Sequence, residues 1–306
     1  MFKLSNDRQV DYVAASGSYG FGFWGLGWLW DKPLIWLGFM QPKLFTIILR
    51  TLTWEPRLYP VSNLSWWRVW TWLPWSKWSC IKFLPNDGSV NKVGLYNPGF
   101  LWWYTKVAPK LNFIQYKIIV SLHGTREDLV RMVKLLEKFS LVAIEINVSC
   151  PNSENPDEED GEIIATVREV RMTSRHPIFL KLGYDKEGRY LKVAKAAAEY
   201  LAAIDLNAVK WEIVFGDKSS PLSSRLRGPG HGGVSGKPAQ KYNWEAVEKL
   251  VEQKAVPIIA SSIMSYDDLV QVKKLKPHAV SFGAIHMRKP WLPTQIVLQD
   301  MQARAR

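Results

Sequence analysis

From residue 112 onward, short β-branched runs alternate with longer segments whose apolar residues recur at helical spacing. Each run is a candidate buried strand, and the helical segments between them indicate repeated βα units around a parallel sheet. Two more strand-like runs lie upstream, and eight such units in one chain predict a TIM (β/α)8 barrel rather than an open doubly wound sheet. The predicted strands are 11–16, 44–53, 117–122, 141–147, 178–183, 203–209, 257–261 and 279–283, and the predicted helices are 125–139, 157–170, 187–203, 243–254, 265–275 and 291–304.

A tryptophan-rich segment follows the second predicted strand and has no place in the alternating pattern. Residues 61–90 are expected to form an insertion within a single barrel domain spanning residues 1–306. The most apolar window, residues 21–39, is interrupted by two charges and a proline at 31–33, so it is not a convincing transmembrane helix. The opening residues lack the basic-then-apolar order of a secretory signal, and the chain has two cysteines, which favours a cytoplasmic protein.

The net charge of +12 is concentrated in the first third of the chain. Residues 1–110 hold 12 Lys and Arg against 5 Asp and Glu, together with 13 of the 16 tryptophans. Interleaved cations and indoles could bind a nucleic acid by phosphate pairing and base stacking, or lie at the periphery of a membrane. Equally, the aromatic side chains could pack as a lid over the core while the charges are solvated. These three interpretations stay open at this point.

Candidate chemistry lies at the carboxyl ends of the predicted strands, where TIM barrels place their active sites. Lys181 is the strongest single residue, because a lysine between Leu180 and Leu182 needs an anionic partner: a carboxylate, a phosphate or an electron-rich cofactor edge. The glycine-rich segment 228–236 is expected to be a loop that brings backbone N–H groups close to an anion, although it could simply be flexible. The other candidates at strand ends are Ser16, Arg50, Asn147, Asn207, Ser261, Ser262 and Gly283.

Several co-ordered motifs resemble those of dihydroorotate dehydrogenases, most closely the soluble, cysteine-bearing class 1 branch. The resemblance covers nearly the whole chain and implies an FMN-dependent TIM barrel of pyrimidine biosynthesis that oxidises dihydroorotate to orotate by hydride transfer to the flavin. The motifs are RTLTWEPR (50–57), KVGLYNPG (92–99), EINVSCPNS (145–153), IFLKLG (178–183), KSSPL (218–222) and GGVSGKP (232–238).

The resemblance also implies a role for individual residues. Cys150 is the expected general base that removes the C5 proton of the substrate. Arg50 stands where the family usually has a lysine. The implied substrate-binding residues are Arg50, Asn97, Asn147, Asn152 and Asn207, and the implied cofactor-binding residues are Ala15, Ser16, Arg50, Asn147, Lys181, Ser235, Gly236, Ser261, Ser262 and Gly283.

Partners and rival functions follow from the same resemblance. The electron acceptor of such an enzyme is fumarate, NAD or quinone, and relatives commonly form homodimers. One rival is an RNA-directed flavin reductase of the dihydrouridine synthase type. It is disfavoured, and no nucleic acid partner is expected, because the substrate-ring asparagines match the free-pyrimidine family. A second rival is a non-catalytic flavin-barrel scaffold at a membrane surface, which Arg50 and the serines of 261–262 would suit.

Overall fold

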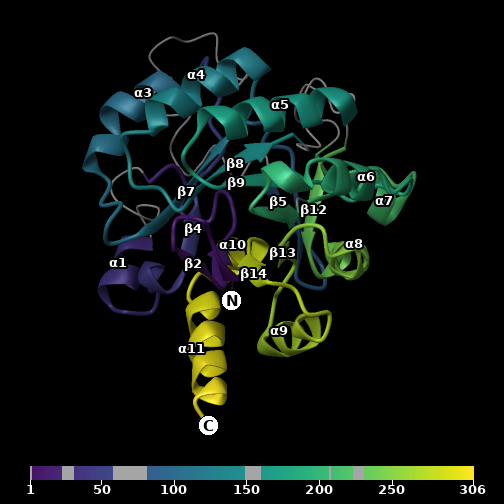
Figure 1. Ribbon diagram of the computed structural model, residues 1–306. Coiled ribbons are helices and arrows are strands. Elements are labelled where there is room, and N and C mark those ends of the chain that lie inside the picture. Colours follow the sequence, from purple (N-terminus) through teal and green to yellow (C-terminus); the bar gives the residue numbers. More distant parts are fainter. Residues whose placement is uncertain (1, 23–30, 58–80, 149–159, 207, 223–230) are drawn as a thin grey trace, which may run out of the picture.

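Eight parallel strands close into a barrel at the centre of the computed structural model, which describes residues 2–22, 31–57, 81–148, 160–206, 208–222 and 231–306 (Figure 1). The barrel strands are β3 (Tyr12–Ala14), β4 (Thr46–Ile48), β7 (Lys117–Leu122), β8 (Ala143–Asn147), β9 (Ile178–Leu182), β10 (Ala203–Leu206), β13 (Ile258–Ala260) and β14 (Ala279–Phe282). They follow one another around the barrel in chain order, and β14 pairs with β3 to close it. Each lies within one of the eight predicted strands, so the predicted TIM barrel is confirmed.

Alternation along the strands divides the barrel into an outer and an inner face. Ile118 and Val120 face the helices, whereas Ile119 between them faces the barrel axis with one residue from each neighbouring strand. A short hairpin of β1 (Phe2–Lys3) and β2 (Gln9–Val10) adds Leu4 and Val10 to this inner cluster. The amino-terminal half of the barrel interior is therefore filled with apolar side chains. Its members from the barrel strands are Val13, Ile48, Ile119, Ala143, Phe179, Ala203, Ile259 and Ala279.

Helices cover the outside of the barrel. Two of them begin at N-caps that hydrogen-bond the first turn: Thr125 accepts from Asp128 N, and Ser265 accepts from Asp268 N. Figure 1 shows α3, α4 and α5 together on one side, while α11 leads to the carboxyl terminus on another. The helices are α1 (Asp31–Trp36), α3 (Phe100–Lys106), α4 (Arg126–Leu136), α5 (Asp160–Thr173), α6 (Arg189–Ala196), α7 (Trp211–Phe215), α8 (Lys237–Gln253), α9 (Tyr266–Lys273), α10 (Ala284–Arg288) and α11 (Leu292–Arg304), with 3-10 turns η1 (Pro42–Leu44), η4 (Ala108–Lys110) and η5 (Ala198–Tyr200).

None of the helices in the described ranges is both long enough and apolar enough to cross a membrane.

A second sheet, antiparallel and of four strands, was not expected from the sequence. Its strands are β5 (Ile81–Leu84), β6 (Gly88–Asn91), β11 (Val209–Lys210) and β12 (Gly233–Gly236), in the order β11-β12-β6-β5. Segment 228–236 was predicted to be a loop, and this is wrong for its last four residues, because they pair with β6 and β11. Residues 81–90, the last part of the expected Trp-rich insertion, contribute β5 and most of β6 to this sheet. The rest of that insertion, residues 61–80, lies outside the described residues, and so does any test of its possible membrane contact.

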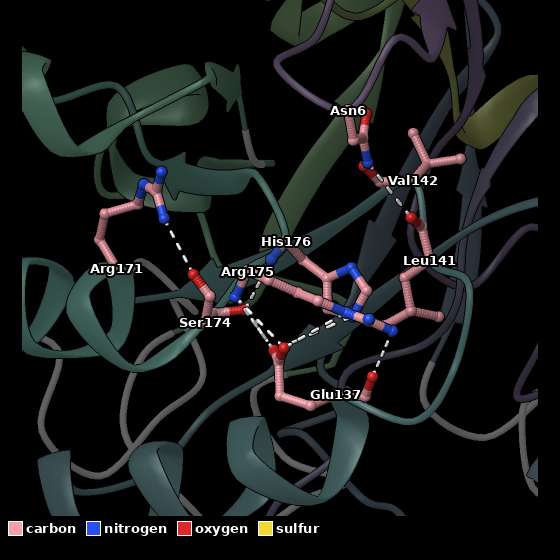
Figure 2. A network of polar contacts seen from close by, with 8 residues as sticks. All are labelled: Asn6, Glu137, Leu141, Val142, Arg171, Ser174, Arg175 and His176. Atoms are coloured by element: carbon pink, nitrogen blue, oxygen red, sulfur yellow. Dashed lines mark hydrogen bonds and ion pairs between the residues drawn. The ribbon is translucent and has the colours of Figure 1, made fainter.

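A polar network holds the amino-terminal end of the barrel (Figure 2). Glu137, just after α4, accepts a hydrogen bond from Ser174 Oγ at 2.8 Å and from the backbone N–H of Arg175 at 3.3 Å. On the other side of the same strands, Asn6 Nδ2 donates to the carbonyl of Val142 at 3.0 Å. These contacts tie the loops that enter β8 and β9 to α4 and to the β1–β2 hairpin. Glu137, Ser174 and Asn6 thus have partners within the protein, in keeping with a structural role for this face.

Candidate active site

A cavity lies between the carboxyl ends of the barrel strands and the second sheet. Barrel residues form its floor, and Asn91, Gly94 and Ser235 contribute to its wall from the second sheet and the chain that follows β6. Asn243 reaches it from α8. All ten residues expected to bind the cofactor line this one cavity: Ala15, Ser16, Arg50, Asn147, Lys181, Ser235, Gly236, Ser261, Ser262 and Gly283.

The expected substrate-binding residues are placed less uniformly. Arg50 and Asn147 line the cavity, but Asn97 does not. The Asn97 amide is buried and used locally: Nδ2 donates to Thr53 Oγ1 at 2.7 Å, and Oδ1 accepts from Gly99 N at 2.9 Å. Its predicted contact with substrate stays a prediction. Three further candidates lie outside the described residues: Cys150, Asn152 and Asn207.

Lys181 forms a buried ion cluster on the cavity floor. Its Nζ lies 3.3 Å from Glu145 Oε1 on β8 and 3.1 Å from Asp205 Oδ2 on β10. The register explains the meeting, because Asp205 pairs directly with Lys181 across β9 and β10. All three side chains are buried, and Glu145 is entirely inaccessible to solvent. Of the alternatives open for the partner of this lysine, the structure therefore provides carboxylates from the protein itself.

The cluster shifts the protonation equilibria of its members. Burial by itself would lower the pKa of Lys181, but Glu145 and then Asp205 outweigh burial and hold the pKa above its ordinary value, so the lysine is an ammonium. Burial raises the pKa of Asp205 to about 6, against the opposing charge of Lys181 and with a further contribution from Glu145. The cluster thus contains a fixed cation and a carboxyl group that titrates close to neutral pH.

Hydrogen bonds extend the cluster across the barrel toward the cavity. Ser121 Oγ donates to Glu145 Oε1 at 2.7 Å and lies 2.8 Å from Thr51 Oγ1. Asn147 Nδ2 in turn donates to Thr51 Oγ1 at 3.1 Å, which fixes the orientation of this cavity-lining amide. Asn147, predicted to bind both substrate and cofactor, is therefore held rigidly in place by its neighbours.

Several buried polar atoms around the cavity have no hydrogen-bond partner among the described residues. Buried oxygens of this kind are normally bonded, so a group of them around one cavity is typical of a ligand site. The amide and hydroxyl oxygens among them suit a ligand that carries N–H groups and hydroxyls. The amide and hydroxyl atoms are Asn147 Oδ1, Asn243 Oδ1, Ser261 Oγ and Ser281 Oγ, and both carboxylate oxygens of Asp205, which is ion-paired with Lys181, belong to the same group.

The loop after β13 keeps a glycine-like backbone although it carries serines. Ser262 has φ of 66°, in the left-handed region that glycine adopts most easily. Contacts from α8 stabilise this conformation: Asn243 Nδ2 donates to Ser262 Oγ at 2.9 Å, and Gln240 Nε2 donates to the Ser262 carbonyl at 3.1 Å. Trp244 Nε1 donates to the carbonyl of Ser261 at 3.1 Å. The loop therefore keeps the backbone conformation of a glycine loop, with the Ser262 hydroxyl bonded to α8.

Sequence reasoning missed the two carboxylates of the ion cluster. Glu145 precedes Asn147 by two positions, and Asp205 precedes the candidate Asn207 by two. Since strand residues two apart share a face, acidic residues at these positions of buried strands had to point into the barrel. That signal is present in the sequence, whereas Lys181 stands out by its apolar neighbours Leu180 and Leu182. Asn243 and Thr51 carried no comparable signal, because they reach the site through helix packing and a loop.

We expect Gly236→Ala to lower the free energy of unfolding by about 1–3 kcal/mol, because φ of 82° with ψ of −154° is open only to glycine. A Cβ there would also lie 2.3 Å from the Asp87 carbonyl oxygen, which pushes β12 away from β6 at the cavity wall. Urea denaturation measures the loss. Gly161→Ala is the matched control: it lies on α5 with nothing within 4 Å of an added Cβ, and should keep or raise stability by up to about 1 kcal/mol. Equal stability of the two variants would contradict the steric argument.

Comparisons with known protein families, relatives and solved structures all point to one family. The family model described as dihydroorotate dehydrogenase matches residues 81–296. A relative from Aeropyrum pernix, provisionally named dihydroorotate dehydrogenase A (fumarate), is 31% identical over 256 residues, covering 81% of this chain and 74% of the relative. The catalytic subunit of dihydroorotate dehydrogenase B (NAD(+)) from Staphylococcus carnosus is 26% identical, covering 69% and 70%. The solved structure of an Eimeria tenella DHODH with ferulenol superimposes with a TM-score of 0.62 at 15% identity, covering 96% of this chain and 81% of that one, which shows a common fold.

Proposed function

The chain belongs to the dihydroorotate dehydrogenase family, and on that premise we propose that it oxidises dihydroorotate to orotate by hydride transfer to FMN bound in the cavity at the barrel mouth. The observation that carries the proposal is the convergence of all ten expected cofactor residues on one cavity whose buried oxygens lack partners among the described residues. Bound FMN would supply the hydride acceptor that the protein's own side chains lack.

The described cavity-lining residues can be assigned to the parts of FMN. Lys181, an ammonium held on the floor, would face the electron-rich N1–O2 edge of the flavin ring. Ser235 and Gly236 would contact the ribityl chain. Around Ser262 and Gly283 we assign the phosphate to peptide N–H groups, and the engagement of the Ser261 and Ser262 carbonyls by α8 supports this assignment.

Catalysis requires a base for the C5 proton and groups that orient the pyrimidine ring. We assign the base to Cys150, which follows β8 by three residues, and ring contacts to Asn147, Asn152 and Asn207. The fixed Asn147 amide would hold the ring against the cavity wall, since both Thr51 and the strand backbone set its position. Arg50, which follows β4 and lines the same cavity, would compensate the substrate carboxylate.

The proposal makes a direct spectroscopic prediction. The purified protein should carry about one FMN per chain, and anaerobic addition of dihydroorotate should bleach the flavin absorbance. A protein that neither contains nor takes up FMN would exclude both this function and the flavin-barrel scaffold. A flavin-loaded protein that dihydroorotate fails to bleach would favour the scaffold. Dihydrouridine-type RNA reduction is disfavoured by the family match.

The electron acceptor can be assigned in the same cuvette. Two electron acceptors, fumarate and NAD(+), appear in the names of the relatives. After bleaching by a limiting amount of dihydroorotate, each of these and a short-chain quinone is added in turn under anaerobic conditions. The acceptor is the compound that restores the flavin absorbance fastest.

A further inference from the structure

The floor of the cavity holds two carboxyl groups and one ammonium. Lys181 Nζ lies 3.3 Å from Glu145 and 3.1 Å from Asp205, and all three side chains are buried. With both carboxyls ionised, the cluster would carry a net negative charge in a place from which water is excluded, and this is costly. Holding one proton on a carboxyl group makes the cluster neutral.

The surroundings of Asp205 leave Lys181 as its one close cation in the described part of the chain. Lys181 faces Asp205 from the neighbouring strand β9. Glu145 lies on β8, the next strand after β9, and contacts the same ammonium. The other neighbour of Asp205, β13, presents isoleucine and alanine side chains, and β14 contributes the hydroxyl of Ser281. Arg50 lines the same cavity from beyond β4, on the opposite wall of the barrel.

We propose that Asp205 is a positioning residue that takes up one proton when FMN binds beside Lys181, so that the lysine can serve the flavin without leaving an uncompensated carboxylate behind it. This inference rests on the flavin site proposed above. It concerns only the protonation of this chain's own side chain, with the proton arriving from solvent and forming an O–H bond on the Asp205 carboxyl.

Geometry selects Asp205 rather than Glu145 as the group that accepts the proton. Ser121 Oγ donates to Glu145 Oε1 at 2.7 Å, so this carboxyl group already has a hydroxyl partner. Among the described residues no hydroxyl donates to Asp205. Asp205 also lines the cavity, whereas Glu145 beside it does not, so of the two carboxyl groups Asp205 is the one that can exchange a proton through the cavity.

The direction of the linkage follows from the pKa of Asp205, which burial raises to about 6. An electron-rich ligand edge that draws on the Lys181 ammonium weakens the compensation of Asp205, so its pKa rises further in the complex. Above pH 6, binding then takes up protons, and FMN affinity falls as pH increases. The fall approaches ten-fold per pH unit until the pKa of the complex is reached.

Calorimetric titration of FMN into flavin-free protein tests the inference. Titrations near pH 7 in buffers of different ionisation enthalpy give the number of protons taken up. The wild type should take up more protons than Asp205→Asn, approaching one more per chain, and its affinity should fall more steeply between pH 6 and 8. The FMN phosphate, with a second pKa of about 6, contributes equally to both proteins. Asp217→Asn, at an exposed position away from the cavity, is the control and should match the wild type.

The outcomes separate this inference from the function on which it rests. Equal proton uptake by the wild type and Asp205→Asn overturns the role of Asp205 and leaves the flavin site standing. Failure of the wild type to bind FMN overturns both. Infrared spectroscopy of wild-type protein labelled with ¹³C-aspartate needs no variant: a carboxylic-acid band should gain intensity at pH 7 when FMN is added. An unchanged band overturns the proposal even if Asp205→Asn does not fold.

Discussion

Replacing Lys181 by Met should lower the free energy of unfolding of the flavin-free protein by about 3–5 kcal/mol, the usual cost of breaking a buried ion pair by removing one partner. Glu145 and Asp205 would then face each other across the barrel floor without a cation. Urea denaturation at pH 7.5 measures the loss. FMN retention should fall as well, because the flavin edge loses its ammonium.

The sign of the pH dependence provides an internal check on this prediction. Burial already raises the pKa of Asp205 to about 6, and removing the lysine raises it further. At pH 5 the carboxyl is protonated and no longer needs a cation, so the loss caused by Lys181→Met should be smaller at pH 5 than at pH 7.5.

Two comparisons make the cause specific. Adding Glu145→Gln and Asp205→Asn to Lys181→Met should restore much of the stability, because neutral side chains leave no buried charge unpaired. Lys249→Met is the matched control: Lys249 pairs with Glu245 on the surface of α8, and its loss should cost less than about 1 kcal/mol. A loss for Lys181→Met no larger than for this control would show that the cluster does not stabilise the barrel.

Changing Cys150 to Ser should slow the reduction of the flavin by dihydroorotate about 10²-fold or more at neutral pH, the scale of a lost general base. A hydroxyl ionises far less readily than a thiol, so partial recovery is expected at high pH. FMN content should be unchanged, since the described cofactor-lining residues are untouched. Anaerobic stopped-flow absorbance measures the rate.

The second cysteine of the chain provides the control for this experiment. Cys80→Ser makes the same replacement of sulfur by oxygen in the Trp-rich segment, and dihydroorotate should reduce the flavin of this variant at the wild-type rate. If Cys150→Ser also reduces at that rate, another group removes the C5 proton. If both variants are slow, the effect is not specific to the proposed base.

Much of the candidate site could be predicted because its residues lie at strand ends, which a local sequence pattern reveals. Strand ends are visible in the sequence, and the polar residues at the ends of β4, β8 and β13 all line the cavity in the structure. Asn97 shows the limit of such reasoning. Its motif stands in the expected place, yet its amide bonds the local backbone at Leu95 and Gly99 and also joins this turn to Thr53, so its predicted contact with substrate stays a prediction.

By itself, the sequence determined the barrel, its eight strands and the end at which the cavity lies, since periods of 2.0 and 3.6 residues are local properties of the chain. Only the tertiary structure decided which inward-facing residues meet. Lys181 contacts Asp205 because of the β9–β10 register, and Gly233 pairs with Asn91 across 142 positions to form the cavity wall. Such pairings depend on packing energies summed over distant segments, and no short stretch of sequence contains them.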